Sequence, residues 1–330
     1  MFSIIIPTFN GGARIAACLG ALLGQTAGED AEILVINDGS TDDTAEVVAR
    51  YSGVRLVNQS NSGPAAARNR GVLEARGEII LFTDDDCEPG PGWLAAMTGP
   101  FKDPTVVGVK GVYRTRQRRL VARFVQIEYE DKYRLMSGAS EIDFIDTYSA
   151  GFRRDRFLEM NGYDTSFPVA CAEDVELSYR MSNRGWIMKF VPAAIVYHTH
   201  PDTIWQYVQK KYKFAFWRVL ALCKNPDKAL RDSHTPQIMK AQLFFLPALL
   251  LALTRDLFLR PARPASTFVI GAFLISALPF ALRAMRKDAV VGLLSPMFLA
   301  ARACSQVFGV VAGLNYTRHR PSQAPAGSVS

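Results

Sequence analysis

Short apolar runs recur along the N-terminal quarter of the chain, and each is bounded by turn-forming or helix-capping residues. The runs are FSIIIP (2–7), AEILVIND (31–38), VRLVNQ (54–59) and EIILFTD (78–84). Segments with helical spacing, such as STDDTAEVVARY, separate them. Strands that are apolar on both faces are buried on both sides, so this alternation predicts an α/β domain with a largely parallel sheet.

Polar clusters follow three of these runs. PTFN, NDGS and TDDD all begin where a predicted strand ends. Ligands of open α/β sheets bind at the carboxyl ends of the strands, so we expect these clusters to lie at one site. The sequence contains neither G-x-G-x-x-G nor G-x-x-x-x-G-K-[ST], which argues against a dinucleotide oxidoreductase and a P-loop NTPase.

The charge of the chain is uneven. The net charge is +7, and many basic residues lie in residues 110–124 and 209–218. Such clusters suit acidic lipid, a phosphorylated ligand or nucleic acid. The five scattered cysteines form no C-x-x-C pair, which predicts a reduced compartment. A strand-like run follows Met1 at once, without signal-peptide features, so we expect the N-terminal part in the cytosol.

Apolar runs of helical length follow residue 240. They span residues 241–254, 265–282 and 289–314. Because they lack the polar stripe of a soluble amphipathic helix, they predict two or three transmembrane helices within residues 240–316; a buried helical subdomain is the alternative. The flanking residues Arg260, Arg286 and Arg318 cannot all be cytosolic if three spans alternate, so one run can be re-entrant or interfacial. Residues 317–330 are expected to be disordered.

The segment before these runs has the pattern of an interfacial helix. It places apolar residues at helical spacing, namely Trp205, Val208, Tyr212, Phe216 and Val219. Lys210, Lys211 and Lys213 fall on other faces. We therefore predict an amphipathic helix in the membrane interface, with a linker, over residues 204–239; a helix packed on the domain is the alternative. Mixed basic and aromatic residues can also bind single-stranded nucleic acid, but no RNA module is recognisable, so nucleic acid is not an expected partner.

Three consecutive carboxylates, Asp84, Asp85 and Asp86, end the fourth apolar run. Like charges repel, and the neighbouring residues supply no cation. Oxygen ligands suit Mg²⁺ and Mn²⁺, and Asp84 and Asp86 can aim at one ion while Asp85 faces elsewhere. The triplet indicates a divalent metal site. A solvated acidic loop, or a cap for the helix that follows, is the alternative.

Five ordered motifs resemble those of family-2 glycosyltransferases. They are SIIIPTFNGG, ILVINDGSTDDT, NSGPAAARNRG, GEIILFTDDDCEPGPGWL and EDVELSYRMSNRG. The resemblance covers about residues 2–200. It implies the GT-A fold for residues 1–203, a Rossmann-like domain with a mixed, mostly parallel sheet that binds a nucleotide-diphosphate sugar, with UDP favoured by family habit.

The resemblance also implies roles for residues at the strand ends. The positions that match the nucleotide-sugar site are Pro7, Thr8, Asp38, Arg68, Asp84 and Asp85. The family's DxD motif matches Asp84 and Asp86, with Asp84 near the ribose and Asp86 a direct ligand of Mn²⁺ or Mg²⁺. Such an ion would bridge the diphosphate and support its departure as a Lewis acid. His198, in VYHTHPD, is a candidate further ligand, with a core or surface histidine as the alternative.

A second pair of carboxylates, Glu173 and Asp174, precedes a helical pattern. Transfer of a sugar to a hydroxyl needs a base that removes the proton. Asp174 matches the family's base, and Glu173 would orient it or line the acceptor site. Carboxylates that only complement the helix dipole are the alternative. Direct displacement with a single base implies inversion at the anomeric carbon.

These observations predict a metal-dependent, inverting glycosyltransferase bound to the cytoplasmic membrane, with its catalytic domain in the cytosol. The acceptor is a hydroxyl or phosphate, and we favour a lipid-linked or glycan acceptor in cell-envelope glycan or glycolipid synthesis. The alternative is a polysaccharide synthase that couples polymerisation to export. QKKYKFAFWR has the residues of the Q-x-x-R-W motif of processive synthases in the wrong order, which favours a single transfer.

Overall fold

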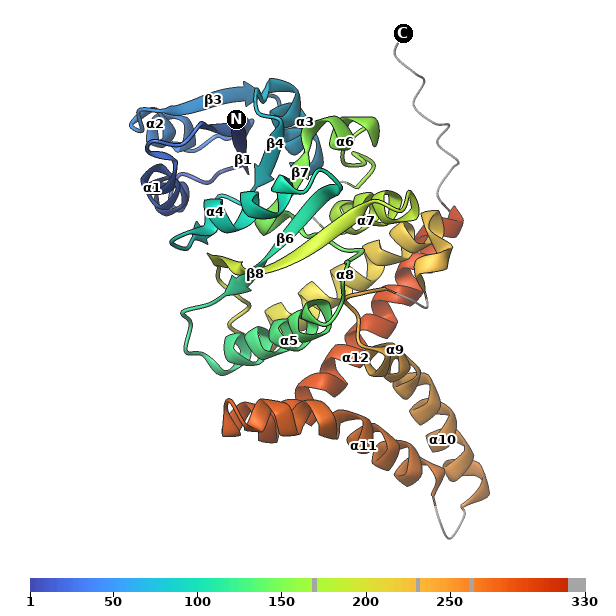
Figure 1. The fold of residues 1–330 in the computed structure, drawn as a ribbon. Helices are drawn as coiled ribbons and strands as arrows, with labels where there is room; N and C mark the ends of the chain where they lie inside the picture. Colours follow the sequence, from blue (N-terminus) through green and yellow to red (C-terminus); the bar gives the residue numbers. More distant parts are fainter. Residues whose placement is uncertain (168–170, 230–231, 261–263, 320–330) are drawn as a thin grey trace.

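A computed structural model of the chain describes residues 1–167, 171–229, 232–260 and 264–319. An α/β domain contains the N-terminus, and long helices extend away from it at the C-terminal end (Figure 1). Two helices of the domain, α5 (Leu120–Ser137) and α8 (Ile204–Lys224), lie between the sheet and these long helices.

The described residues form one sheet of eight strands in the order β3-β2-β1-β4-β7-β6-β8-β5. The strands are β1 (Phe2–Thr8), β2 (Ala31–Asp38), β3 (Val54–Gln59), β4 (Ile79–Phe82), β5 (Glu88–Pro89), β6 (Val106–Arg114), β7 (Ala150–Arg153) and β8 (Ile187–Tyr197). Strands β1 to β4 are parallel, and β7 is antiparallel to β4 and β6. The predicted α/β fold with a mostly parallel sheet is confirmed.

Helices cover both faces of the sheet. The remaining helices are α1 (Ile15–Thr26), α2 (Thr44–Ala49), α3 (Pro64–Glu74), α4 (Trp93–Thr98), α6 (Arg154–Glu159), α7 (Glu173–Asn183), α9 (Gln237–Ala241), α10 (Phe245–Leu259), α11 (Ala265–Met285) and α12 (Ala289–His319). In β1, Ile4 and Ile6 belong to one core cluster and Ile5 to the other, and all three are fully buried. The run is therefore apolar without alternation, as strands covered on both faces are.

The C-terminal region contains long apolar helices. Within the described residues, three segments are long and apolar enough to cross a membrane, namely Gln237–Leu259, Ala265–Met285 and Ala289–His319. This agrees with the predicted apolar runs. The prediction of disorder from residue 317 was wrong for residues 317–319, because α12 continues to His319. The rest of that predicted tail, residues 320–330, lies outside the described residues.

Helix α12 packs on the α/β domain along most of its length. Near its start, Phe298 stacks on Phe124 of α5, with ring centroids 4.6 Å apart. Further along, Ser305 donates a hydrogen bond to the carbonyl oxygen of Val208 in α8 at 2.5 Å. Gly309 and Gly313 then face α8 so closely that a Cβ at either would lie within 3 Å of a carbonyl oxygen of α8. Small residues spaced by four thus let two helix backbones approach.

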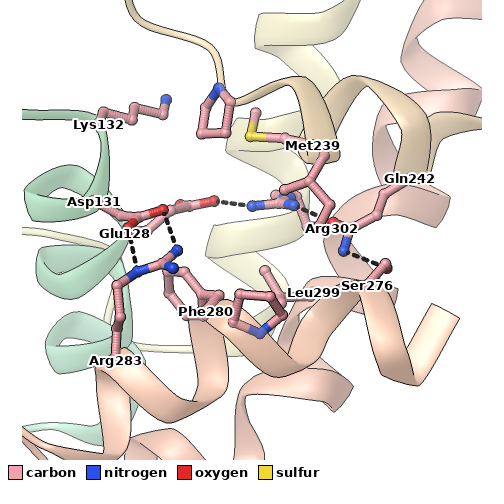
Figure 2. A pocket seen from close by; sticks show the side chains of 13 residues that line it. Glu128, Asp131, Lys132, Met239, Gln242, Ser276, Phe280, Arg283, Leu299 and Arg302 are labelled. Atoms are coloured by element: carbon pink, nitrogen blue, oxygen red, sulfur yellow. Dashed lines mark hydrogen bonds and ion pairs between the residues drawn. The ribbon is translucent and has the colours of Figure 1, made fainter. Parts of the chain in front are cut away.

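A buried ion network joins the domain to this helix (Figure 2). Arg302 of α12 and Lys211 of α8 contact Glu128 of α5, at 2.8 Å and 2.6 Å. Arg302 also donates to Gln242 at 2.7 Å. Glu128 and Arg302 are 3% and 4% exposed. Burial raises the pKa of Glu128, but the cations of Lys211 and Arg302 outweigh this and lower it, so the carboxylate stays charged.

The buried face of α8 differs from the predicted apolar stripe. Trp205, which begins the predicted stripe, is 67% exposed, whereas Tyr207, Lys211 and Ala215 are buried. Lys211 was predicted on another face but lies inside the molecule, because Glu128 supplies its countercharge and α12 covers it. The alternative of a helix packed on the domain is therefore confirmed for one face. Contact of α8 with a membrane interface stays a prediction.

The close approach of α12 to α8 predicts a position-specific effect of alanine. In Gly309→Ala the new Cβ would lie 2.5 Å from the carbonyl oxygen of Tyr212. Such overpacking costs about 1–3 kcal/mol, which exceeds the gain of up to about 1 kcal/mol for alanine over glycine in a helix. We expect the thermal midpoint of the detergent-solubilised chain to fall. The matched control is Gly271→Ala in α11, where nothing lies within 4 Å, and equal midpoints for both variants would contradict the packing.

Candidate active site

Two cavities meet at the carboxyl end of the parallel strands. The first is a cleft of about 550 Å³, and the residues at its wall include Pro7, Thr8, Arg14, Asp38, Arg68, Asp84, Asp85 and Asp86. The second, of about 270 Å³, extends toward α5 and α8 and is lined by residues that include Asp84, Asp86, Glu173, Asp174 and His198. Asp84 and Asp86 line both cavities. The structure thus brings together all the site residues that the sequence predicted.

Two arginines offset most of the charge of the acidic triplet. Asp84 pairs with Arg68 at 2.7 Å. Asp85 accepts two hydrogen bonds from Arg14, at 2.8 Å and 3.1 Å, and one from the hydroxyl of Thr8 at 2.6 Å. Part of the positive charge that the sequence left to a metal ion therefore comes from the chain itself. These countercharges were not predicted, because Arg14 lies just before α1, 71 residues from Asp85, and Arg68 lies in α3.

The third carboxylate, Asp86, is the one suited to a cation. Its Oδ1 lies 3.4 Å from Nδ1 of His198, and this ring nitrogen has no hydrogen-bond partner among the described residues. Partial burial raises the pKa of Asp86, but His198 and Arg14 together lower it, so the net pKa is below its ordinary value. Burial raises the pKa of the nearby Cys87 thiol, which stays neutral. A carboxylate and an imidazole remain, and both are ligands that Mn²⁺ accepts.

Two of the predicted binding residues pair with other groups of the chain. Arg68 is 2% exposed and bridges Asp84 and Glu173, the second at 3.1 Å. Asp38 accepts hydrogen bonds from the backbone of Ser62 and Gly63, both at 2.8 Å, and from Gln59 at 2.7 Å. Both side chains therefore shape the cleft wall and hold it in place.

Asp174 is the carboxylate that opens into the second cavity. It lies in the first turn of α7, and its Oδ1 accepts a hydrogen bond from the backbone N–H of Val175 at 2.7 Å. The neighbouring Glu173 is 1% exposed and is held by Arg68. Burial, followed by the negative charges of Glu173 and Asp146, raises the pKa of Asp174 well above its ordinary value. A carboxylate with a raised pKa is a stronger base.

The two histidines of VYHTHPD have different environments. His198 lines the second cavity beside Asp86. His200 is buried, stacks on Tyr129 at 5.4 Å, and has its pKa lowered to about 3, mainly by burial. His200 is therefore a neutral histidine in the core. His198 remains the candidate metal ligand.

Several residues of the second cavity were not predicted. They are Lys110, Lys132, Asp146, Arg218 and His234. Their elements are separated by long stretches of sequence, and only the pairing of β6 and the docking of α5 and α8 bring them together. No local motif contains them. The many basic residues in 110–124 and 209–218 indicated an anionic partner, but they did not show which residues would line the site.

The fold agrees with the GT-A class of glycosyltransferases. The model of the family described as Glycosyl transferase family 2 matches residues 3–159, which include most of the α/β domain. These residues therefore match a family-2 glycosyltransferase domain.

Two named glycosyltransferases are similar to this chain in sequence. The pre-mycofactocin glycosyltransferase of Mycobacterium tuberculosis is 24% identical over 68% of this chain and 48% of its own length. The validoxylamine A glucosyltransferase of Streptomyces hygroscopicus subsp. limoneus is 30% identical over 56% of this chain and 48% of its own length. The chain thus spans about half the length of these relatives.

The solved structures extend the similarity of fold beyond the domain. The mannosyltransferase PcManGT from Pyrobaculum calidifontis, in complex with GDP-Man and Mn²⁺, aligns with a TM-score of 0.62 and 21% identity. The alignment covers 95% of this chain and 86% of that one, so the similarity includes helices after the catalytic domain. Glucosyl-3-phosphoglycerate synthase from Mycobacterium tuberculosis, with Mn²⁺ and UDP-Glc, aligns over 68% of this chain and 78% of that one, with a TM-score of 0.50 and 19% identity.

The position of Asp86 beside His198 predicts that Asp86 affects metal binding and that the nearby Glu88 does not. Asp86→Asn should weaken Mn²⁺ binding by about tenfold or more, because it removes the charged oxygen that faces His198. Glu88→Gln, two residues later and paired with the exposed Arg116, should leave it unchanged. Calorimetric or spin-resonance titration of Mn²⁺ measures both. Equal affinities of Asp86→Asn and the unmodified chain would exclude Asp86 as a ligand.

Proposed function

We propose that this chain is an inverting, metal-dependent glycosyltransferase that moves a sugar from a nucleotide-diphosphate donor to an acceptor held beside the membrane. The observation that carries the proposal is the meeting of two cavities at Asp84 and Asp86, with Asp174 opening into the second. One cavity can hold a donor and the other an acceptor. The two substrates would then meet where the carboxylates lie.

The first cavity has the features of a donor site. It lies at the end of the parallel strands, where α/β sheets bind nucleotides. Pro7, Thr8 and Asp38 form its wall beside Asp84 and Asp85. Asp86, with His198, would hold Mn²⁺ or Mg²⁺, which supplies Lewis-acid support for the departing diphosphate. Structures of the same fold hold GDP-Man or UDP-Glc with Mn²⁺, and we favour a UDP-sugar here.

In the second cavity Asp174 acts as general base. Its partly exposed carboxylate, with a pKa raised by burial and by Glu173, would accept the proton of an attacking hydroxyl. Glu173 is the positioning residue, since it is buried between Arg68 and the backbone N–H groups of Cys171 and Ala172. Attack from this side, opposite the leaving diphosphate, inverts the anomeric carbon.

The C-terminal helices would anchor this site at the cytosolic face of the cytoplasmic membrane. Arg302 donates a hydrogen bond to Gln242, between α9 and α10. Near the end of α11, Arg283 pairs with Asp131 of α5 at 2.8 Å. The end of α10 and the start of α11 lie far from the domain (Figure 1). Exposed apolar side chains on this hairpin include Phe258 at 78% and Ile275 at 72%.

We infer from this packing that the α10–α11 hairpin crosses the membrane and that α12 stays on the side of the domain. A helix that contacts α5 and α8 cannot cross the bilayer independently of them. The arrangement leaves Arg260 at the far end of the hairpin and keeps Arg286 and Arg318 on one side, as the positive-inside rule favours. A site beside the bilayer favours a lipid-linked acceptor in cell-envelope glycan or glycolipid synthesis.

The base assignment predicts a loss of turnover without a loss of donor binding. Asp174→Asn should lower turnover by about a hundredfold or more, as loss of a general base does. Asp86→Asn should instead weaken Mn²⁺-dependent binding of the nucleotide diphosphate. Because the pKa of Asp174 is raised and its ionised form is active, turnover should rise with pH through that pKa. Asp174→Asn should abolish this rise.

Release of nucleotide diphosphate and calorimetry with Mn²⁺ measure the two effects. If Asp174→Asn loses nucleotide binding as severely as Asp86→Asn, or keeps near-normal transfer, the two roles are wrongly assigned. Asp155→Asn, at the exposed start of α6, is the matched control and should change neither quantity.

The hairpin arrangement predicts which side of the membrane each arginine faces. We expect a membrane-impermeant thiol reagent to label Arg260→Cys from outside intact cells. Arg286→Cys and Arg318→Cys should react only after permeabilisation. The background carries Cys223→Ser, because that native cysteine is exposed. Three alternating spans would place residue 318 outside with residue 260, so external labelling of Arg318→Cys contradicts the proposal.

A further inference from the structure

One wall of the second cavity is rich in cations. Lys110 is buried and pairs with Asp146. Arg218 pairs with Asp232 at 3.0 Å. Lys132, from α5, and Lys210, from α8, line the same cavity. Lys110 and Arg218 therefore have a carboxylate partner, whereas Lys132 and Lys210 have none among the described residues. The ammonium group of Lys210 instead lies 5.6 Å from the ring centroid of Phe214.

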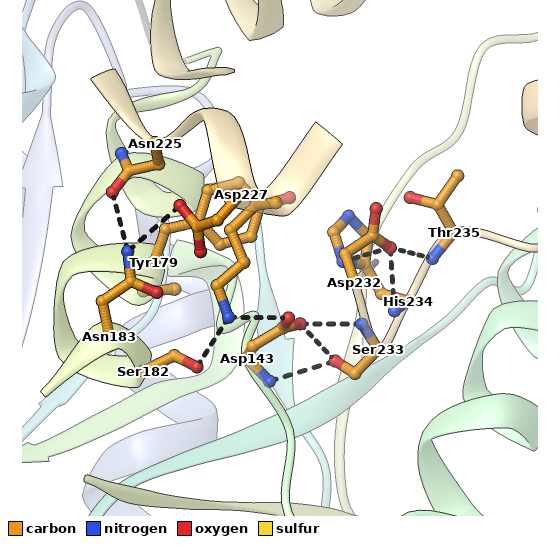
Figure 3. A network of polar contacts seen from close by, with 12 residues as sticks. Asp143, Tyr179, Ser182, Asn183, Asn225, Asp227, Asp232, Ser233, His234 and Thr235 are labelled. Carbon is orange, nitrogen blue, oxygen red and sulfur yellow. Dashed lines mark hydrogen bonds and ion pairs between the residues drawn. The ribbon is translucent and has the colours of Figure 1, made fainter. Parts of the chain in front are cut away.

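The segment after α8 is fixed against the domain and completes this wall (Figure 3). Asp143 accepts hydrogen bonds from the backbone N–H and the hydroxyl of Ser233, at 2.8 Å and 2.6 Å. His234 stacks on Phe144, with ring centroids 4.0 Å apart. Burial and the charge of Arg218 lower the pKa of His234 well below its ordinary value, so the ring is neutral and adds no cation.

Lys132 has no hydrogen bond or ion pair among the described residues. Its ammonium group lies 5.7 Å from the ring centroid of Tyr129. Figure 2 shows it beside the network of Glu128 and Arg302, yet joined to neither. A partly buried cation that lacks a carboxylate and lines a cavity is a site for an anionic ligand.

We propose that the second cavity binds an acceptor with two separate groups, a phosphate and a hydroxyl. Lys132 binds the phosphate, and Asp174 deprotonates the hydroxyl. This inference rests on the proposed function and narrows its acceptor. A phosphate that attacked the sugar itself would need no base, because it is already ionised at neutral pH. Asp174 and Lys132 in one cavity therefore indicate a phosphorylated alcohol, in which the nucleophile and the anion are different groups.

The test uses the full chain in detergent micelles with Mg²⁺ and UDP bound. Glycerol 3-phosphate and glycerol serve as probes, and calorimetry measures their affinities. We expect the phosphate ester to bind and glycerol not to bind at the same concentrations. Lys132→Met should weaken binding of the ester by about tenfold or more, the worth of a charge-assisted hydrogen bond. Lys132→Arg should restore most of it.

Lys213→Met is the matched control, because that lysine is exposed on α8 outside the cavity. It should bind the ester as the unmodified chain does. Equal affinity of Lys132→Met and the unmodified chain would overturn the inference. If Lys132→Met unfolds, Lys132→Gln replaces it. Loss of UDP binding in the unmodified chain would instead refute the proposed donor site, so the two failures are distinguishable.

Proton uptake gives an independent readout. Burial, followed by the nearby charge of Lys211, lowers the pKa of Lys132 to about 7. An anion beside this group raises its pKa, so binding at pH 8, where a phosphate monoester is already doubly ionised, should take up protons. Calorimetry in two buffers of different ionisation enthalpy measures this uptake. Asp174, with a raised pKa, and Lys210, with a pKa lowered mainly by burial, line the same cavity and can add to the uptake. Uptake in Lys132→Met equal to that of the unmodified chain would contradict the role of Lys132.

The phosphate can belong to a soluble metabolite or to a lipid head group. Nanodiscs of phosphatidylcholine, with or without phosphatidylglycerol, separate these sources. Loss of glycerol 3-phosphate binding only in the discs that contain phosphatidylglycerol identifies a lipid head group as the competitor. Retained binding in both discs identifies a soluble phosphate ester. Either result supports the cavity as a phosphate site.

Discussion

Carboxylates that repel one another are held together at the carboxyl edge of the sheet, and the rest of the catalytic domain depends on how that repulsion is offset. Arg14, just before α1, and Arg68 from α3 neutralise Asp85 and Asp84, respectively. Arg68 also contacts Glu173, so one guanidinium joins the two acidic groups that flank the reaction centre. This arrangement leaves Asp86 and Asp174 without an arginine partner, and they are the residues proposed to hold a metal ion and to accept a proton.

The same principle operates at the junction with the long helices. Glu128 lies on α5 between Lys211 and Arg302, and removing either cation would leave a buried charge unpaired. Helix α5 also contributes Lys132 to the second cavity. The helix that anchors the C-terminal region therefore also forms the wall of the proposed acceptor site. Positioning of the membrane helices and the shape of this cavity are linked through a single element.

Features that depend on a short stretch of sequence could be predicted. Continuous apolar runs predicted β1 to β4, and the polar ends of those strands predicted the cleft that contains Pro7, Thr8 and Asp84. The countercharges could not be predicted, because an arginine on a helix carries no sign of the carboxylate it will meet. The buried face of α8 was predicted wrongly for a related reason: Lys211 is polar by composition, and only Glu128 and α12 make its burial possible.

The position of Arg302 also imposes an order of assembly. This residue lies in the middle of an apolar helix, and its partner Glu128 comes 174 residues earlier in the chain. An arginine is strongly disfavoured in a buried apolar interior until it is paired. Its partner is presented only once α5 has docked on the sheet. The catalytic domain leaves the ribosome first and must therefore fold before α12 can dock. The last helix then packs on a surface that α5 and α8 have already formed.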